Sequence, residues 1–320
     1  MAHASLKAFA FSSLIVVTAC GREPARDHAV EDSGVRPAIA EGVVTGDYAR
    51  NVGTLVYNVN GVWHWFCCGG TLVHPRVFVT AGHCIANILT YAPAGARVGV
   101  SFVPKIDISA DPWGDPPLPA DAVVYAGTPI LHPRFDMNLF FDSEGNWLGE
   151  YSPNADVGIV LFDKPVRGMV PAAVAPQGTL DLVAKVWPGM PVGLASYGLS
   201  WDCDLDNSCP NVLPDPDWAT RRYGTFRFQR LTPSWAVFQD APSDVSDCDS
   251  GGPFFPSAAA VLGRMVPPRY VPMVLATVTG YLASSELAQC HDDCGASIGF
   301  RMDTALAHEF LDQYLHVPVH

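Results

Sequence analysis

Basic side chains are scarce in this sequence of 320 residues. Lys and Arg together number 19 against 32 Asp and Glu, so the formal net charge is −13 at pH 7. Nucleic-acid binding depends on cationic side chains that neutralise phosphates. The charge balance therefore argues against a nucleic-acid partner, whereas an acidic surface favours solubility and attracts basic partners.

Long helical periodicity is scarce as well, and only 16% of the residues are charged. Many short runs rich in Val, Thr and aromatic residues lie between turn residues drawn from 28 Gly and 28 Pro. This pattern is typical of an all-β sandwich or barrel. The length and the 49% hydrophobic content allow one large all-β domain or two smaller ones.

The nine cysteines lack the paired Cys-x-x-Cys arrangement with His that holds structural zinc. Several lie close together instead, which favours disulfides formed in an oxidising compartment. The close pairs are Cys67/Cys68, Cys203/Cys209 and Cys290/Cys294.

The N-terminus indicates export. Lys7 precedes an apolar stretch, residues 8–19, that is too short to span a bilayer as a mature helix. The stretch ends in Val-Thr-Ala-Cys20, which resembles the bacterial lipobox, so we expect residues 1–20 to be a lipoprotein-type signal with Cys20 lipidated. The alternative is a plain secretory signal cut nearby. Without Cys20 an even number of cysteines, eight, remains. The expected location is the bacterial cell envelope, lipid-anchored, or the exterior.

The chain then changes character near residue 39. Residues 21–38 contain almost no large apolar side chain and predict a disordered tether. A pro-segment is the alternative for this stretch, and both could hold. Residues 39–320 are expected to form the folded domain.

Asp247-Cys248-Asp249-Ser250-Gly251-Gly252-Pro253 is the candidate nucleophile segment. Such a sequence predicts a tight, exposed turn with backbone amides crowded around one hydroxyl. That arrangement suits a nucleophile beside an anion-binding pocket. Taken alone, the stretch is also ordinary turn chemistry.

Two further motifs lie upstream. Thr80-Ala81-Gly82-His83-Cys84 follows an apolar strand, and Asp156 heads the apolar run Val157–Leu161. Burying a carboxylate without a partner is costly. The imidazole of His83 is the natural partner for Asp156.

These three motifs closely resemble the trypsin/chymotrypsin-like serine proteases, and the resemblance extends from about Ile39 to His316. It implies an all-β fold of two six-stranded antiparallel Greek-key β-barrels with a C-terminal helix. It also implies a catalytic triad of His83, Asp156 and Ser250, with an oxyanion hole formed by the backbone N–H groups of Cys248 and Ser250. A monomer that cleaves proteins or peptides without a cofactor is expected.

Cys248 departs from this family, which nearly always has glycine there. If the position requires a positive φ, a cysteine adds about 1–2 kcal/mol of strain. Cys248 could be the family's usual cysteine in a shortened loop, bonded to Cys290 or Cys294. We prefer a Cys67–Cys248 bond that pins the turn to the first barrel. The remaining pairs would be Cys68–Cys84, Cys203–Cys209 and Cys290–Cys294.

The resemblance also suggests a specificity and an activation site. Asp244 matches the pocket aspartate that pairs with substrate Arg or Lys, although a surface aspartate is the alternative. Family zymogens are cut so that a new N-terminus, here Ile39, pairs with the aspartate before the nucleophile, here Asp249. Arg36 precedes a proline, so the site before Ile39 is not a clean tryptic one.

The acidic loops favour no metal site. Asp107, Asp111, Asp115 and Asp121 are expected in a solvated loop, with calcium the weaker alternative. The Asp-x-Asp-x-Asp spacing at 202–206 resembles a calcium loop but lacks the following glycine and the bidentate glutamate.

Residues 137–153 are expected to be an inserted surface loop that shapes substrate access. Strands are expected at 52–59, 98–103, 122–125, 223–231 and 274–280, and a helix at 304–316.

Two other functions compete with the peptidase. A catalytically silent protease homologue that acts as a binding module is supported only by Cys248. An esterase of the α/β-hydrolase type fails because its nucleophile precedes its histidine and sits in Gly-x-Ser-x-Gly.

Overall fold

The computed structural model describes residues 43–45, 49–107, 115–198, 219–240, 245–246, 248–257, 272–281 and 296–319. All of them belong to one compact unit, Gly34–His320.

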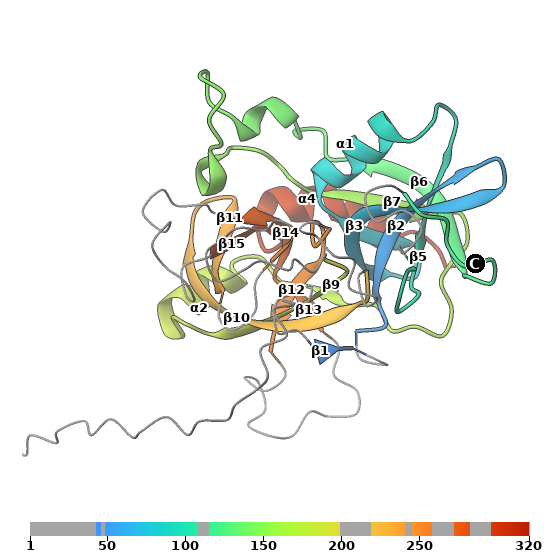
Figure 1. Cartoon of the computed structure of the whole chain (residues 1–320). Helices are drawn as coiled ribbons and strands as arrows, with labels where there is room; N and C mark the ends of the chain where they lie inside the picture. Colours follow the sequence, from blue (N-terminus) through green and yellow to red (C-terminus); the bar gives the residue numbers. More distant parts are fainter. Residues whose placement is uncertain are drawn as a thin grey trace, which may run out of the picture. The chain divides into compact units, whose positions relative to one another are not determined.

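The first barrel closes through six antiparallel strands in the order β2-β3-β4-β7-β6-β5 (Figure 1). Asn60 and Gly61 join β2 to β3 and both have positive φ, as a type I′ hairpin turn requires. The barrel interior is filled by fully buried aliphatic and aromatic side chains that include Leu55, Phe78 and Phe162. The strands are β2 (Val52–Val59), β3 (Val62–His74), β4 (Val77–Thr80), β5 (Arg97–Ser101), β6 (Val124–Leu131) and β7 (Gly158–Phe162).

The second barrel is closed by the pairing of β9 with β10, and β1 (Val43–Val44) adds to the edge of β10. Its core contains Phe238 stacked on Phe254, with ring centroids 3.9 Å apart. A separate parallel pair joins β8 (Ala173–Val174) to β13 (Met273–Val274). The barrel strands are β9 (Pro191–Ser196), β10 (Arg222–Leu231), β11 (Trp235–Asp240), β12 (Pro253–Pro256), β14 (Ala276–Tyr281) and β15 (Ala296–Arg301).

The expected architecture of two six-stranded antiparallel barrels and a C-terminal helix, α4 (Ala305–Leu315), is confirmed. Several details of the sequence prediction are wrong. Helices α1 (Gly82–Tyr91) and α2 (Thr179–Val186) were not expected, because both are short and amphipathic between strands. Ala122 lies in a turn that its N–H closes onto Pro119, so β6 begins later than predicted. The first-barrel strand predicted at 98–103 ends at Ser101.

Two apolar clusters join the barrels. Val79 and Ile159 of the first barrel pack in one cluster with Trp235 and Phe300 of the second. The other cluster brings together side chains from both barrels, namely Val52, Val56, Trp65, Ala195, Tyr197, Cys248 and Phe255. Loops at this junction are therefore held from both sides.

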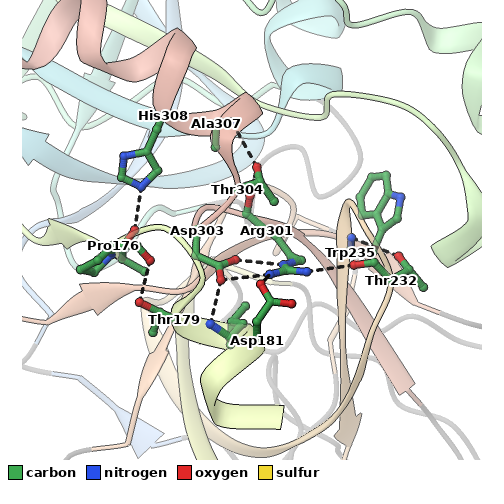
Figure 2. A network of polar contacts seen from close by, with 12 residues as sticks. Pro176, Thr179, Asp181, Thr232, Trp235, Arg301, Asp303, Thr304, Ala307 and His308 are labelled. Atoms are coloured by element: carbon green, nitrogen blue, oxygen red, sulfur yellow. Dashed lines mark hydrogen bonds and ion pairs between the residues drawn. The ribbon is translucent and has the colours of Figure 1, made fainter. Parts of the chain in front are cut away.

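A polar network anchors α4 to the second barrel (Figure 2). Arg301 donates from Nε to Asp303 Oδ1 at 2.9 Å and from Nη2 to Asp181 Oδ2 at 2.6 Å. Asp303 Oδ2 also accepts from Leu180 N, at the start of α2, at 2.7 Å. Thr304 caps α4 by accepting from Ala307 N at 3.1 Å. The network fixes both helices to the end of β15.

Candidate active site

His83 lies in the first turn of α1, immediately after β4. Its side chain is 14% exposed. Gly82 is required there by close packing, since a Cβ would lie 2.6 Å from the Phe135 ring and 3.0 Å from Val157 N. The glycine therefore lets the start of the helix approach the segment that carries Asp156.

Asp156 is fully buried and accepts from both the backbone and the ring of His83. His83 N donates to Oδ1 at 2.7 Å, and Nδ1 lies 3.0 Å from Oδ2. Because a buried carboxylate needs donors, this geometry fixes the imidazole with its Nδ1 proton toward Asp156. The other ring nitrogen, Nε2, is then left as a proton acceptor.

Thr279 completes the surroundings of Asp156. Its hydroxyl, on β14 of the second barrel, donates to Asp156 Oδ2 at 2.7 Å. Sequence reasoning missed this residue. The strand Ala276–Tyr281 carries two threonines, Thr277 and Thr279, and nothing in the sequence singles out Thr279 as the one that contacts a carboxylate.

Ser250 lies half-buried in a turn that both barrels hold. Gly69 N on β3 donates to Ser250 O at 2.7 Å, and Gly251 N donates to Val278 O at 2.8 Å. Gly251 has φ 82°, and a Cβ on it would lie 3.0 Å from Ala81 N. The turn thus approaches the backbone just before His83.

The candidate nucleophile and base are not hydrogen-bonded to each other. Among the described residues, no hydrogen bond joins Ser250 Oγ to His83 Nε2. Cys84 Sγ, a disulfide sulfur, lies 3.7 Å from Nε2. Such bonds are often long in ligand-free enzymes and tighten when substrate binds.

Two backbone donors of the turn are free within the described part of the chain. Neither Cys248 N–H nor Ser250 N–H donates a hydrogen bond to a described residue. Cys248 has φ 72° and is buried. Buried N–H groups are almost always paired, and an open backbone N–H is the kind of donor that can bind an anionic oxygen.

Two disulfides connect the site to β3. Cys67 pairs with Cys248, as the preferred pairing expects, with a Cα–Cα distance of 4.5 Å. Cys68 pairs with Cys84, with a Cα–Cα distance of 6.0 Å. The alternative bond from Cys248 to Cys290 or Cys294 is therefore not the one formed.

Asp249 is a fully buried carboxylate without a cationic contact among the described residues. Gly198 N donates to it at 2.7 Å and Ser246 N at 3.0 Å. Burial raises the pKa of Asp249 to about 7, although these hydrogen bonds partly oppose the shift. An ammonium group placed nearby would lower that pKa again.

The segment expected to be an inserted loop borders the site with aromatic side chains. It contains the 3₁₀ turns η1 (Met137–Phe140) and η2 (Gly149–Tyr151). The Phe140 ring lies edge-on to His83, with centroids 6.3 Å apart, and stacks on Trp147 at 5.1 Å. Trp147 is 41% exposed. The loop therefore offers an apolar wall beside the imidazole.

Asp115 is not the solvated side chain expected of an acidic loop. It accepts from Tyr57 OH at 2.6 Å. In the described part of the chain, the one cluster of three metal-ligand types is Cys68, His83 and Cys84. Both sulfurs there belong to the disulfide, so they cannot act as thiolate ligands.

Several predicted site residues lie outside the described residues. They are the lipidation candidate Cys20, the activation candidate Ile39, the specificity candidate Asp244, and Asp111, Cys203, Cys209, Cys290 and Cys294. No described helix has the length and apolar character that crossing a bilayer requires.

Comparison with solved structures defines the fold class. The chain is similar to HL collagenase, with a TM-score of 0.51 and 14% identity over 87% of this chain and 99% of that one. It is also similar to human heparin binding protein, with a TM-score of 0.51 and 13% identity over 89% of this chain and 97% of that one. The architecture is the chymotrypsin fold. No protein-family model and no curated protein sequence matches it.

Proposed function

We propose that this protein is a serine endopeptidase that hydrolyses peptide bonds through His83, Asp156 and Ser250. The pairing of buried Asp156 with His83 Nδ1, at the junction where the Ser250 turn docks, is the observation that carries the proposal. A histidine with a purely structural role does not require a buried carboxylate as its partner. Here that carboxylate, Asp156, is also oriented by Thr279 from the second barrel.

The chemistry follows from these positions. Substrate binding brings Ser250 Oγ within reach of Nε2, which takes its proton as Oγ attacks the peptide carbonyl. Asp156 holds the tautomer and stabilises the imidazolium. The acyl-enzyme forms as His83 returns the proton to the leaving amine, and water then releases the acid by the same route.

The open N–H groups of Cys248 and Ser250 would stabilise the developing oxyanion. Loss of one such donor lowers turnover by roughly 10²–10³-fold. Asp244 is proposed to select Arg or Lys at the cleaved bond by ion pairing. An Asp244→Ser variant should fold normally and stop cleaving after Arg, and an unchanged Arg preference would reject this assignment.

A fluorophosphonate probe tests the proposal directly. It should label Ser250 in the wild-type protein and fail to label Ser250→Ala and His83→Ala, with the labelled peptide identified by mass spectrometry. His308→Ala is the control, because that imidazole belongs to the C-terminal helix α4, where its Nε2 lies 2.8 Å from Ala175 O. Labelling that survives His83→Ala would mean that the hydroxyl reacts without the proposed base.

A silent homologue that binds a partner is the second candidate. It is favoured because no hydrogen bond joins Ser250 Oγ to His83 Nε2 among the described residues. The likeness to a heparin binding protein, whose name denotes a ligand and not a reaction, also favours it. A folded protein that neither labels nor cleaves a peptide library, before or after proteolytic processing, would establish this alternative.

Processing and location complete the proposal. The two disulfides suit an oxidising compartment. We propose export with a lipid on Cys20, which incorporation of labelled palmitate, lost in Cys20→Ser, would test. Activation would place the amino group of Ile39 beside Asp249, and N-terminal sequencing of active protein should then begin at Ile39.

A further inference from the structure

Cys248 holds an unfavourable backbone conformation at a position where its N–H matters. Its φ of 72° lies in the left-handed region, which a Cβ disfavours and glycine tolerates. The peptide on its N-terminal side carries one of the two open donors described above. If φ relaxed to a negative value, this N–H would turn away from its partner on Ser250.

Among the described residues, backbone hydrogen bonds fix the turn after Cys248 but none fixes Cys248 itself. Ser250 is held by Gly69 N and Gly251 by Val278 O. Within the described residues, no backbone hydrogen bond involves Cys248. The bond that does hold it is the disulfide to Cys67, two residues before Gly69 on β3. Strand β3 therefore holds the turn at two positions, by the disulfide from Cys67 and by the hydrogen bond from Gly69 N.

The two disulfides differ in access from solvent. Cys67 is exposed, whereas Cys68 and Cys84 are 4% and 0% exposed. Thiol–disulfide exchange requires the attacking thiolate to reach a sulfur. A reductant in solution can therefore reach the Cys67–Cys248 bond through Cys67, whereas the buried Cys68–Cys84 bond is shielded from it.

We infer that the Cys67–Cys248 disulfide is a positioning device that holds the oxyanion-binding N–H of Cys248, and that a dithiol reductant switches the peptidase off by breaking it. This inference rests on the proposed peptidase function. The disulfide holds Cys248 at a positive φ, which a glycine at this position would adopt without strain.

The switching step balances as an ordinary exchange. A thiolate of the dithiol attacks Cys67 Sγ, the bond between the two cysteine sulfurs breaks, and Cys248 leaves as a thiolate that takes up a proton. The second thiol of the reagent then displaces Cys67, which is released as a thiol. Two electrons pass to the protein, and the dithiol becomes a cyclic disulfide.

The first test uses the wild-type protein and dithiothreitol. Differential alkylation with mass spectrometry should find Cys67 and Cys248 reduced while Cys68 and Cys84 remain bonded. The rate of fluorophosphonate labelling at Ser250 and kcat for the best peptide of a fluorogenic library should then fall by roughly 10²–10³-fold, as expected for one lost donor. KM should change less than twofold, and re-oxidation should restore kcat.

Two variants separate positioning from simple stabilisation. Cys67→Ala leaves Cys248 untethered and should show the same loss of kcat. Adding Cys248→Gly to Cys67→Ala removes the bond but restores a residue that adopts positive φ freely, so kcat should return to within about tenfold of the wild type. Both variants lack the same cross-link, so they should share a lowered thermal midpoint.

The outcomes are distinct. Equal labelling before and after selective reduction overturns this inference and leaves the peptidase proposal intact. A double variant as inactive as Cys67→Ala, with the same thermal midpoint, overturns it as well, because the bond would then only stabilise the fold. A wild-type protein that is never labelled in either redox state overturns the peptidase proposal and this inference together.

Discussion

Among the described residues, the second barrel and its loops contain two buried carboxylates, and they are satisfied in different ways. Asp303 faces the guanidinium of Arg301, a permanent cation fixed within the same strand end (Figure 2). Asp249, next to Ser250, accepts only from neutral donors among the described residues, and burial raises its pKa to about 7. The carboxylate that anchors a helix has its cation built in. The one beside the reactive turn has a charge that depends on pH or on a partner supplied later.

Asp156 stands between these two cases. It is as buried as Asp249, but its main partner is the imidazole of His83. The three aspartates therefore differ in their partners. Asp303 faces a permanent cation, Asp249 faces neutral donors among the described residues, and Asp156 faces an imidazole. Substitutions that remove each partner should separate these roles.

The largest effect is expected for Asp156→Asn. The amide keeps the shape of the site but favours the wrong tautomer of His83, so kcat should fall by about 10⁴-fold. Steady-state kinetics on a peptide selected from a library measure the loss of kcat, and circular dichroism should show an unchanged fold. A loss below about tenfold would show that Asp156 does not orient the base.

Arg301→Met should act on stability instead. It leaves Asp303 buried without its cation, which costs about 3–5 kcal/mol in the free energy of unfolding. Urea denaturation measures the change, and the Arg301→Met, Asp303→Asn double variant should recover part of it. Asp163→Asn, which breaks the exposed pair with Arg97, is the matched control and should change little. If the two single variants behaved alike, the buried network would not anchor α4.

The raised pKa of Asp249 should make the free energy of unfolding depend on pH. Its folded pKa of about 7 exceeds the ordinary value near 4, so the folded state retains a proton that the unfolded state loses between these values. The free energy of unfolding should therefore fall by roughly 4 kcal/mol as pH rises from 4 to 7. Urea titrations across this range should show the slope in the wild type and lose it in Asp249→Asn.

A chain cut before Ile39 offers a further comparison. If the new ammonium reaches Asp249, it lowers the carboxylate pKa and the slope between pH 4 and 7 should flatten or reverse. An unchanged slope in the cut protein would show that the ammonium binds elsewhere.

The smallest effect is expected for Thr279→Val. It removes one neutral donor from the buried Asp156 carboxylate, a contact of about 1.5 kcal/mol, so kcat should fall about tenfold. Thr279→Ser should retain activity because it keeps the hydroxyl. Equal kinetics for the two variants would contradict an orienting role.

Sequence patterns predicted the parts of the site whose chemistry is local. His83 and Ser250 occur in short motifs whose residue types match those of the family that the sequence resembles, and the polar head of an apolar strand singled out Asp156. The Cys67–Cys248 pairing was expected from the family resemblance, which places the residue before Cys68 close to the oxyanion turn, and because this set pairs all eight cysteines. The motifs needed only a few neighbouring residues, whereas the pairing needed the fold that the resemblance implies.

Contacts between distant segments could not be predicted in this way. Thr279 and Asp156 are 123 residues apart, and Arg301 and Asp181 are 120 apart. Nothing near either partner specifies the other, since docking of the two barrels creates the first contact and packing of α2 at the end of β15 creates the second. Helix α2 was missed for a related reason: its eight residues bury only Leu180 fully, so the apolar periodicity is too brief to detect.

The Cys67–Cys248 bond also has a consequence for how the chain matures. It closes a loop of 181 residues, against 16 for Cys68–Cys84. In the chain-entropy model this restricts the denatured ensemble by on the order of 5 kcal/mol, compared with about 3 kcal/mol for the short loop. During synthesis, Cys67 must remain unpaired beside Cys68 until the last quarter of the chain emerges. Correct assembly should therefore depend on a disulfide isomerase that removes bonds formed too early with the neighbouring sulfur.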